Sequence, residues 1–373
     1  MTRATGANIG VGKKDLKRRP PGYESDTGDF TMSLTHKERM RLALQHQPID
    51  RIPTQMGYTG DMGAKIAKHL SVSVDDLPTV VDNHMIRVDL SYPKRFNDDG
   101  SLYYDWWGVG WSTHEEGYLP AECPLAGNDN LADYPWPDPD DPHLLDEAAR
   151  IIKADNREHF ITPNFGFALF ERAWTLRGLE NFMMDMLLKP DFANELLDRI
   201  TDIQVKLIKR YLDLGMDGGY FGDDYGAQKG MLFSPASWRE MIKPRLARMF
   251  APFKAAGMPI LMHSDGQIGD ILPDLVEIGL TTLNPVQPEI LDHTWLKQTF
   301  GNQLSYYGGV STQTVLPSGT PAEVQAAAGQ AIRLLAPHNT GLMLAPSHRM
   351  MVDIPLENVE ALLSVFEQMG EAV

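Results

Sequence analysis

The sequence predicts an α/β protein of the (β/α)₈ class, a TIM barrel with an N-terminal arm and an inserted hairpin and loop region. The first observation is that short apolar, strand-like runs alternate with segments of helical apolar spacing, which is typical of parallel βα units. The second is that eight such runs occur, each leading to a helix or to a connection that contains one. The third is that no glycine-rich phosphate loop follows the first strand, which disfavours a doubly wound sheet, the alternative architecture.

The first elements follow a segment that we expect to lie outside the barrel. Residues 1–32 are rich in glycine, proline and charge, which predicts a flexible arm. Residues 33–373 form the predicted single barrel domain. A Ser or Thr cap and helical apolar spacing predict a first helix that stops at Pro48. A first strand, a helix and a second, more polar strand are predicted next, over residues 50–58, 61–70 and 83–92.

The stretch from about residue 96 to 142 interrupts this rhythm and is predicted to be an insertion. The segment "GSLYYDWWGVGWST" alternates in polarity as an antiparallel hairpin does, and "DYPWPDPDDPH" is a loop of proline and aspartate. An ordinary surface loop and a lid over one end of the barrel are both compatible with this composition.

After residue 142 the alternation becomes regular. Six further strands are predicted over 160–167, 218–224, 259–264, 281–286, 304–310 and 341–347. The helices between and after them are predicted over 178–214, with a break near Lys189 and Pro190, and over 235–256, 267–278, 290–299, 321–336 and 355–369.

Charge and cysteine content exclude several classes of function. The chain of 373 residues has 34 Lys and Arg against 50 Asp and Glu, a net charge of −16, which argues against nucleic acid or an anionic membrane as a partner. Its one cysteine, Cys123, excludes an intrachain disulfide and a cysteine-rich metal cluster. With no apolar run of membrane-spanning length and no signal-peptide core, the sequence predicts a cytoplasmic protein acting on a small molecule.

A candidate metal site lies where two predicted strands end. His263 and Asp265 are two residues apart at a strand-to-helix corner, so both side chains can point to one face, and His348 follows the last strand. Two imidazoles and a carboxylate with an open position suit a catalytic Zn²⁺, and they also suit Fe²⁺. The alternative is a hydrogen-bonded pair in which Asp265 orients His263 or caps the following helix.

An acidic doublet and an arginine are further candidates. Asp223 and Asp224 directly follow a strand, where neighbouring carboxylates raise one pKa and suit a proton donor or a site for a cationic group; a cap of the next turn is the alternative. Arg172 is a candidate clamp for a substrate carboxylate, although an ion pair of Glu171 with Arg172 or Arg177 explains it equally. The remaining candidates for substrate contact at the strand ends are Tyr58, Phe165, Tyr225 and Gln287.

Three long segments resemble the uroporphyrinogen decarboxylase superfamily. They are "YFGDDYGAQKGMLFSPASWREMIKPRLARMF", "MHSDGQIGDILPDLVEIGLTTLNPVQPE" and "LAPSHRMMVDIPLENVEALL", and "FERAWTLRGLENFMMDML" is similar to its strand-three region. The resemblance covers residues 33 to 370 in order. It implies a (β/α)₈ barrel, in agreement with the strand count.

Two chemistries are known in this superfamily, and the resemblance is nearer to the second. Uroporphyrinogen decarboxylases use no cofactor and hold a carboxylated tetrapyrrole with an Arg-x-x-x-Arg segment after the first strand, whereas this chain has "QMGYTGDMGAK" there; His348 does fall where these enzymes keep a histidine. Corrinoid-linked methyltransferases bind Zn²⁺ through His-x-Cys and a distant Cys. Here the matching positions are His263-Ser264-Asp265 and Ser347-His348, so a bound metal would be harder and suited to an ether oxygen, or no metal would bind.

The resemblance implies an enzyme that transfers a methyl group from a small methoxylated or methylated substrate to a corrinoid protein. In this hypothesis His263, Asp265 and His348 hold zinc, while Asp223, Asp224 and His348 are the catalytic residues and no organic cofactor is bound. The corrinoid is expected on a separate protein, and a homodimer is plausible by analogy. The alternatives are a cofactor-free decarboxylase or lyase of a carboxylated substrate, and a barrel that binds a ligand without turnover.

Overall fold

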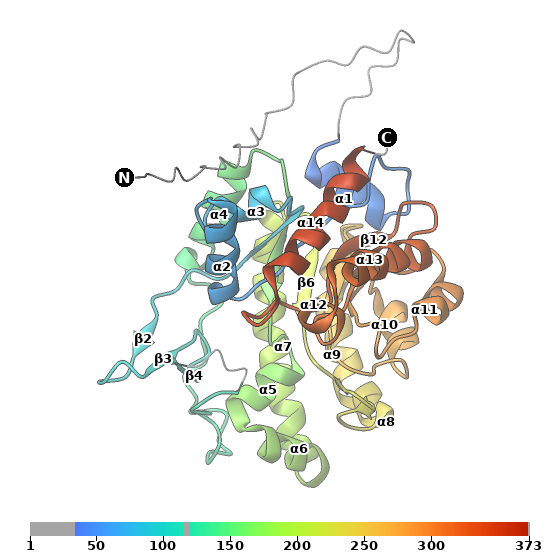
Figure 1. Ribbon diagram of the computed structural model, residues 1–373. Coiled ribbons are helices and arrows are strands. Elements are labelled where there is room, and N and C mark those ends of the chain that lie inside the picture. Colours follow the sequence, from blue (N-terminus) through green and yellow to red (C-terminus); the bar gives the residue numbers. More distant parts are fainter. Residues whose placement is uncertain (1–33, 115–118, 372–373) are drawn as a thin grey trace, which may run out of the picture. The chain divides into compact units, whose positions relative to one another are not determined.

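Seven parallel strands form the central sheet in a computed structural model that describes residues 34–114 and 119–371 (Figure 1). All neighbouring strands in this sheet run parallel. The predicted N-terminal arm lies outside the described residues. In sheet order the strands are β1 (Met85–Val88), β5 (Phe160–Phe165), β6 (Gly219–Gly222), β9 (Ile260–His263), β10 (Thr282–Val286), β11 (Ser305–Val310) and β12 (Leu342–Pro346).

The eighth predicted strand, residues 50–58, is a closing segment rather than a regular strand. The Gln55 N–H donates to the Leu344 carbonyl of β12 at 3.0 Å, and the Thr54 carbonyl accepts from the His84 N–H at 3.1 Å, so the segment joins the two edges of the sheet. Its ladder is irregular because side-chain amides replace backbone groups. The Gln55 side chain bonds to both backbone groups of Met85, and the Asn83 side chain bonds to both backbone groups of Met56.

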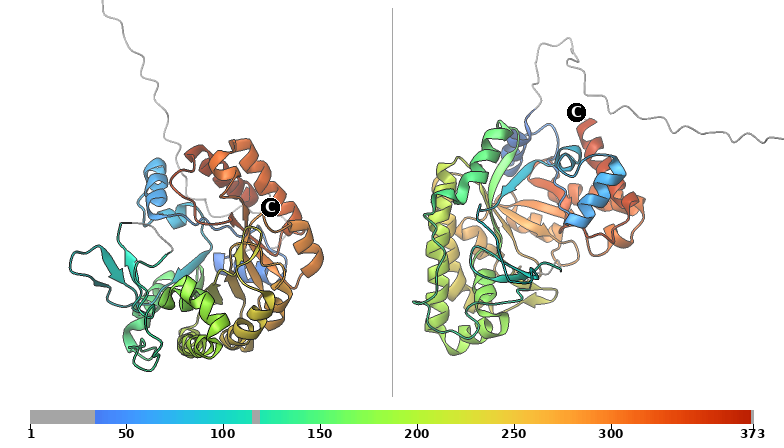
Figure 2. Two further views of the ribbon diagram at one scale, coloured as in Figure 1. Left: turned by 90° about the horizontal axis from the view of Figure 1, so that it is seen from below. Right: turned by 90° about the vertical axis from the view of Figure 1, so that its left-hand side faces the viewer.

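Helices surround the strands, as the left-hand view of Figure 2 shows from below. The predicted break near Lys189 is confirmed, because Pro190 begins a new helix that needs no N–H at that position. The helix α4 was not predicted. The helices are α1 (His36–Leu44), α2 (Gly60–Leu70), α3 (Leu77–Val80), α4 (Asp146–Asp155), α5 (Phe170–Arg177), α6 (Leu179–Leu188), α7 (Pro190–Asp213), α8 (Pro235–Ser237), α9 (Lys243–Ala255), α10 (Leu272–Ile278), α11 (His293–Phe300), α12 (Val315–Ser318), α13 (Pro321–Leu335) and α14 (Leu356–Glu371), with a π-helical turn at Trp238–Ile242 and a 3₁₀ turn at Pro142–Leu145. None of the described helices is both long and apolar enough to cross a membrane.

Two small antiparallel sheets decorate the barrel. The predicted hairpin of the insertion is confirmed as β3 (Leu102–Tyr104) and β4 (Gly110–Ser112), with β2 (Arg95–Phe96) added at its edge. A second hairpin, β7 (Gly226–Ala227) and β8 (Gly230–Met231), follows β6 and was not predicted from the sequence.

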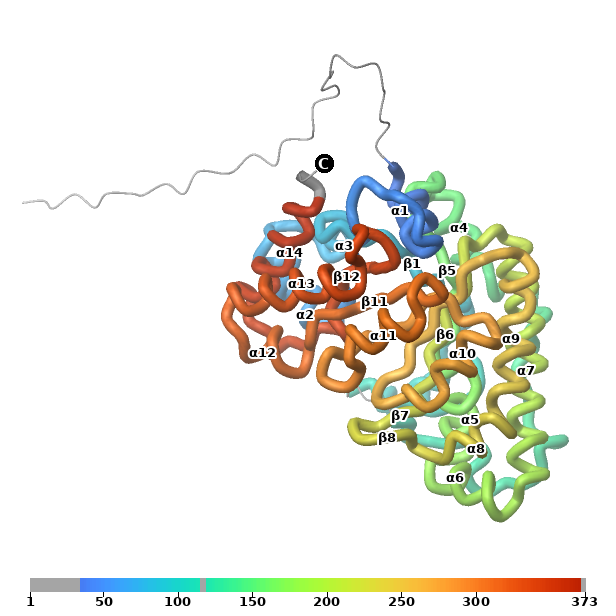
Figure 3. Tube along the Cα trace, turned by 90° about the vertical axis from the view of Figure 1, so that its right-hand side faces the viewer, coloured from blue at the N-terminus to red at the C-terminus, as the bar shows by residue number. Residues whose placement is uncertain are grey.

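The helix α1 packs against the amino ends of the strands. Its residues Met40 and Leu44 join a buried cluster inside the barrel with Met85, Phe160 and Met343, among others. Figure 3 shows α1 at the opposite end of the sheet from β7 and β8. The amino end of the barrel is thus filled by apolar side chains, which leaves the carboxyl ends of the strands for a cavity.

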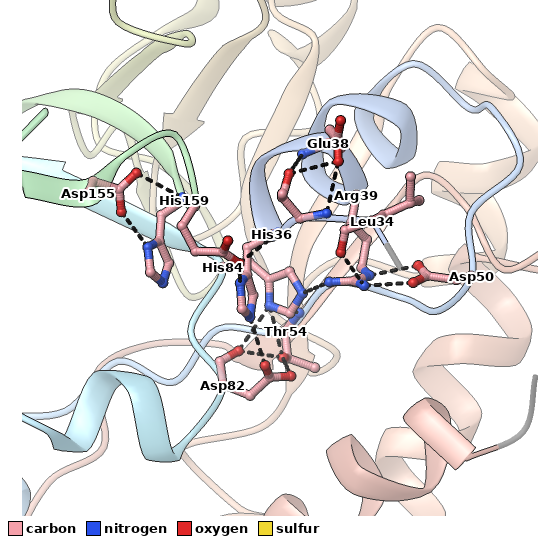
Figure 4. Close-up of polar contacts among 12 residues, drawn as sticks. Leu34, His36, Glu38, Arg39, Asp50, Thr54, Asp82, His84, Asp155 and His159 are labelled. Atoms are coloured by element: carbon pink, nitrogen blue, oxygen red, sulfur yellow. Dashed lines mark hydrogen bonds and ion pairs between the residues drawn. The ribbon is translucent and has the colours of Figure 1, made fainter. Parts of the chain in front are cut away.

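A group of titratable residues at the amino end of the barrel, which we call the amino-end cluster, comprises His36, Asp82, His84 and Glu158, and Figure 4 labels the first three of them. The two ring nitrogens of His36 contact Glu158 Oε1 at 2.5 Å and Asp82 Oδ1 at 2.9 Å. Burial alone would lower the pKa of His36, but the hydrogen bonds to Asp82 and Glu158 raise it above its ordinary value. A protonated His36 therefore ties the start of α1 to the loops before β1 and β5.

The same cluster has the spacing of a metal site, since His36, Asp82 and His84 each offer a ligand atom within 4.8 Å of the others. These atoms are already engaged. Arg39 donates to His84 Nε2 at 3.1 Å, and Arg51 donates to Asp82 Oδ2 at 2.5 Å. Burial lowers the pKa of His84 to about 3, so its ring is the neutral acceptor of the Arg39 hydrogen bond. A metal ion would have to displace a guanidinium, so we interpret the cluster as a structural network.

Candidate active site

A cavity of about 1130 Å³ opens at the carboxyl ends of the barrel strands. Its wall includes the last residues of β5, β9 and β12, namely Phe165, His263 and Pro346. The insertion adds aromatic rings to the opposite wall, including Trp107 and Trp111. The insertion is therefore part of the site and not only a surface loop, and the cavity has the size of a small-molecule site.

His263 is held in one orientation by the neighbouring strand. Its Nδ1 lies 2.8 Å from Asn284 Oδ1, and the Asn284 side-chain amide donates to the Tyr307 carbonyl at 3.0 Å. Tyr220 also donates to Asn284 Oδ1, at 3.0 Å. Because this arrangement leaves Asn284 Oδ1 as an acceptor, His263 donates from Nδ1, and the neutral form of the ring has its lone pair on Nε2.

Asp265 and His348 face that lone pair. His263 Nε2 lies 3.7 Å from Asp265 Oδ1, and His348 Nε2 lies 3.8 Å from Asp265 Oδ2. Burial, and then the neighbouring His263, lower the pKa of His348, which favours the neutral imidazole. The structure thus brings together all three residues that the sequence suggested as metal ligands.

The three residues fit a zinc ion. Their ligand atoms lie within 4.8 Å of one another, and a set of two imidazoles and one carboxylate leaves one position of a tetrahedron open. Asp265 Oδ1 is buried and has no hydrogen-bond partner among the described residues, which is costly for a carboxylate oxygen unless a cation or a donor faces it. Asn284 supplies the hydrogen bond to the far nitrogen that metal-binding histidines commonly make.

Two further carboxylates, Asp224 and Glu171, line the cavity. Asp224 Oδ1 accepts from the Asp265 N–H at 2.8 Å and lies 3.9 Å from His263 Nε2. Burial raises the pKa of Asp224, and burial together with the charges of Asp224 and Asp223 raises the pKa of Glu171 well above its ordinary value. Both shifts favour the protonated carboxyl, and the shift is larger for Glu171. The sequence suggested Asp224, whereas Glu171 was considered only for an ion pair.

Asp223 and Tyr225 lie behind the cavity wall and not on its surface. Both are fully buried, and Tyr225 donates to Asp223 Oδ2 at 2.6 Å. Asp223 accepts from the backbone N–H groups of Phe170 and Glu171 at 2.9 and 2.7 Å, which caps the start of α5. This placement does not match the predicted contact of Asp223 and Tyr225 with a substrate. Asp223 is a cap, but of α5 and not of the following turn that the sequence suggested, because it points to the opposite face of the strand end from Asp224.

Arg172 lines the cavity but is already paired. Its Nη1 donates to Asp105 Oδ2 at 2.8 Å, and its guanidinium lies 5.3 Å from the centre of the Trp107 ring. The predicted ion pair of Glu171 with Arg172 or Arg177 is therefore wrong, since the partner of Arg172 is Asp105 of the insertion. Arg177 is removed from the cavity and pairs with Asp185 and Asp129.

The other predicted contact residues are on the cavity wall. Tyr58, Phe165 and Gln287 all line it, and Gln287 Oε1 accepts from the Gly266 N–H at 3.1 Å, which fixes the loop after His263. Sequence reasoning missed Arg87 of β1. The available signal was an arginine two residues after Met85 in an otherwise apolar strand, which places its side chain on the barrel interior.

Comparisons with known proteins agree with this architecture. The pattern that defines the family described as uroporphyrinogen decarboxylase (URO-D) matches residues 122–369. A methylated-thiol–coenzyme M methyltransferase of Methanosarcina mazei is 24% identical over 157 residues, which are 42% of this chain and 41% of the relative, so less than half of that protein is matched. A solved structure described as a methyltransferase from Methanosarcina mazei has the same fold, with a TM-score of 0.68 at 21% identity over 90% of this chain and 98% of that chain.

Proposed function

Because the chain belongs to the uroporphyrinogen decarboxylase family, we propose that it is a metal-assisted methyltransferase that moves a methyl group from a small methoxylated or methylated substrate to a corrinoid protein. The observation that carries the proposal is the convergence of His263, Asp265 and His348 on one point of the cavity, with a buried Asp265 oxygen that lacks a partner among the described residues. The two methyltransferases from Methanosarcina mazei support it as relatives in sequence and fold.

In this proposal His263, Asp265 and His348 would hold a zinc ion, and the bound ion would supply Lewis acidity at the heteroatom that carries the methyl group. Asn284 keeps the Nε2 of His263 directed to the site by accepting from its Nδ1. The heteroatom that loses the methyl group gains a proton. Glu171 is placed to donate it, because burial and the nearby Asp224 favour its protonated form.

The first test is metal content of the full chain, purified without chelator and measured by mass spectrometry. The wild type should contain about one zinc per chain, and a His263→Ala variant should contain none. His143→Ala is the matched control, because the exposed His143 side chain pairs with Asp146 on the surface and is not a proposed metal ligand. Absence of stoichiometric metal in the wild type would contradict the proposed metal site.

The second test is turnover. The protein should transfer methyl groups from methoxylated or methylated amine substrates to a corrinoid protein, and EDTA should abolish the reaction. Turnover of a carboxylated substrate that survives EDTA would instead support the second candidate, a cofactor-free decarboxylase. That candidate is favoured by one observation, the presence of Arg87 and Arg172 on the cavity wall.

A further inference from the structure

Arg87 is a cation on the inner wall of the barrel, deep in the same cavity. It projects from β1 on the side of Met85, one layer closer to the carboxyl ends of the strands, and its guanidinium lies 4.6 Å from the centre of the Tyr220 ring. Unlike Met85, the side chain is exposed, and it is the cavity that exposes it. A functional group of a ligand can therefore reach it.

No ion pair engages Arg87 within the described residues. The carboxylate of Asp89 raises the pKa of Arg87 through its charge, but its Oδ1 accepts a hydrogen bond from Asn164 Nδ2 at 2.7 Å. The contrast with Arg172 is clear, because the guanidinium of Arg172 is already neutralised by Asp105 at 2.8 Å. An enclosed cation needs a polar or anionic partner, and Arg87, whose contacts include Tyr220 but no ion pair among the described residues, still has a place for an anion.

Arg87 is also connected to the candidate metal ligands. It lies against Tyr220, Tyr220 donates to Asn284, and Asn284 accepts from His263. If the carboxylate of an organic acid binds to Arg87, the rest of the molecule extends into the cavity, where apolar rings such as that of Phe165 line the wall. The attraction for an anion is local to the Arg87 guanidinium, because the cavity wall also carries carboxylates and the net charge of the chain is −16.

We propose that Arg87 forms a carboxylate-binding subsite, and that the methyl donor of the proposed function is an organic acid whose carboxylate pairs with this guanidinium. This inference rests on the proposed function for the identity of the substrate, while the subsite itself needs neither metal nor turnover. The guanidinium can bind a carboxylate with two parallel hydrogen bonds, which an ammonium group cannot do.

The test is calorimetric binding to the full chain of acetate, benzoate and 4-methoxybenzoate, each against its uncharged amide. The wild type should prefer the acids, and Arg87→Met should weaken acid binding about tenfold or more while leaving amide binding unchanged. Arg87→Lys, which retains the charge, should bind the acids with intermediate affinity. Arg150→Met is the matched control, since Arg150 pairs with Glu147 on the surface.

Two results would overturn the subsite. One is a wild type without preference for any of the acids over its amide, and the other is an equal loss of acid and amide binding in Arg87→Met. Methyl transfer from carboxylated donors that is unaffected by Arg87→Met would leave the proposed function standing and remove the subsite. Selective acid binding without methyl transfer to a corrinoid protein would keep the subsite and remove the proposed function.

Discussion

Removal of the Asn284 side chain should weaken metal binding without removing a metal ligand. In an Asn284→Ala variant His263 loses the acceptor at its Nδ1, so the ring is free to rotate and to exchange its tautomer. Loss of such a hydrogen bond commonly lowers metal affinity by about 10- to 100-fold. That range corresponds to about 1.4 to 2.7 kcal/mol of binding free energy.

The assay is a competitive zinc titration of the purified chain against a chromophoric chelator. Thr282→Val is the matched control, because Thr282 is buried on the same strand and its hydroxyl has no hydrogen-bond partner among the described residues. This control should retain the wild-type affinity. An Asn284→Ala variant that binds zinc within about twofold of the wild type would refute the orientation argument, since about 0.4 kcal/mol is too little for a lost hydrogen bond.

Three further predictions concern the framework of the site. Because the pKa of His36 is raised in the folded state, the stabilisation that protonated His36 provides is present below pH 6.5 and is lost as the pH rises through the raised pKa. His36→Gln should therefore lower the unfolding midpoint more at pH 6 than at pH 9. A difference that does not depend on pH would contradict this. Asp223→Asn should reduce the free energy of unfolding by about 1–2 kcal/mol in thermal unfolding, because one N–H at the start of α5 loses its acceptor; an unchanged midpoint would argue against the cap. A double-mutant cycle of Arg172→Met and Asp105→Asn should give a coupling energy of about 2–3 kcal/mol, and additive effects would show that the buried pair contributes nothing.

Much of the fold could be predicted because apolar runs reveal buried strands directly. The central-sheet strands β5, β6, β9, β10, β11 and β12 match the predicted ranges, since strands buried on both faces read as continuous apolar segments. The closing segment was predicted as a regular strand because its apolar spacing is strand-like. Its irregularity depends on the side-chain amides of Gln55 and Asn83, and no local pattern shows that these replace backbone partners.

The candidate site was only partly predictable, and the reason is pairing between distant segments. His263 and Asp265 could be placed together because alternate strand residues share a face. The choice between Asp223 and Asp224 could not be made, because it depends on which of them faces the backbone of α5. The partner of Arg172 is 67 residues away in the insertion, beyond the reach of any local pattern.

The closing segment also has a dynamic consequence. It joins β12 and β1 partly through side-chain hydrogen bonds in place of a regular backbone ladder, so we expect it to open with less free energy than the strands of the central sheet. Its residues Gly57 and Tyr58 lie on the cavity wall, and opening there would give the cavity a lateral entrance. Amide hydrogen exchange should be faster at Gln55 than at Phe221 in β6, and a ligand that fills the cavity should slow exchange at this seam first.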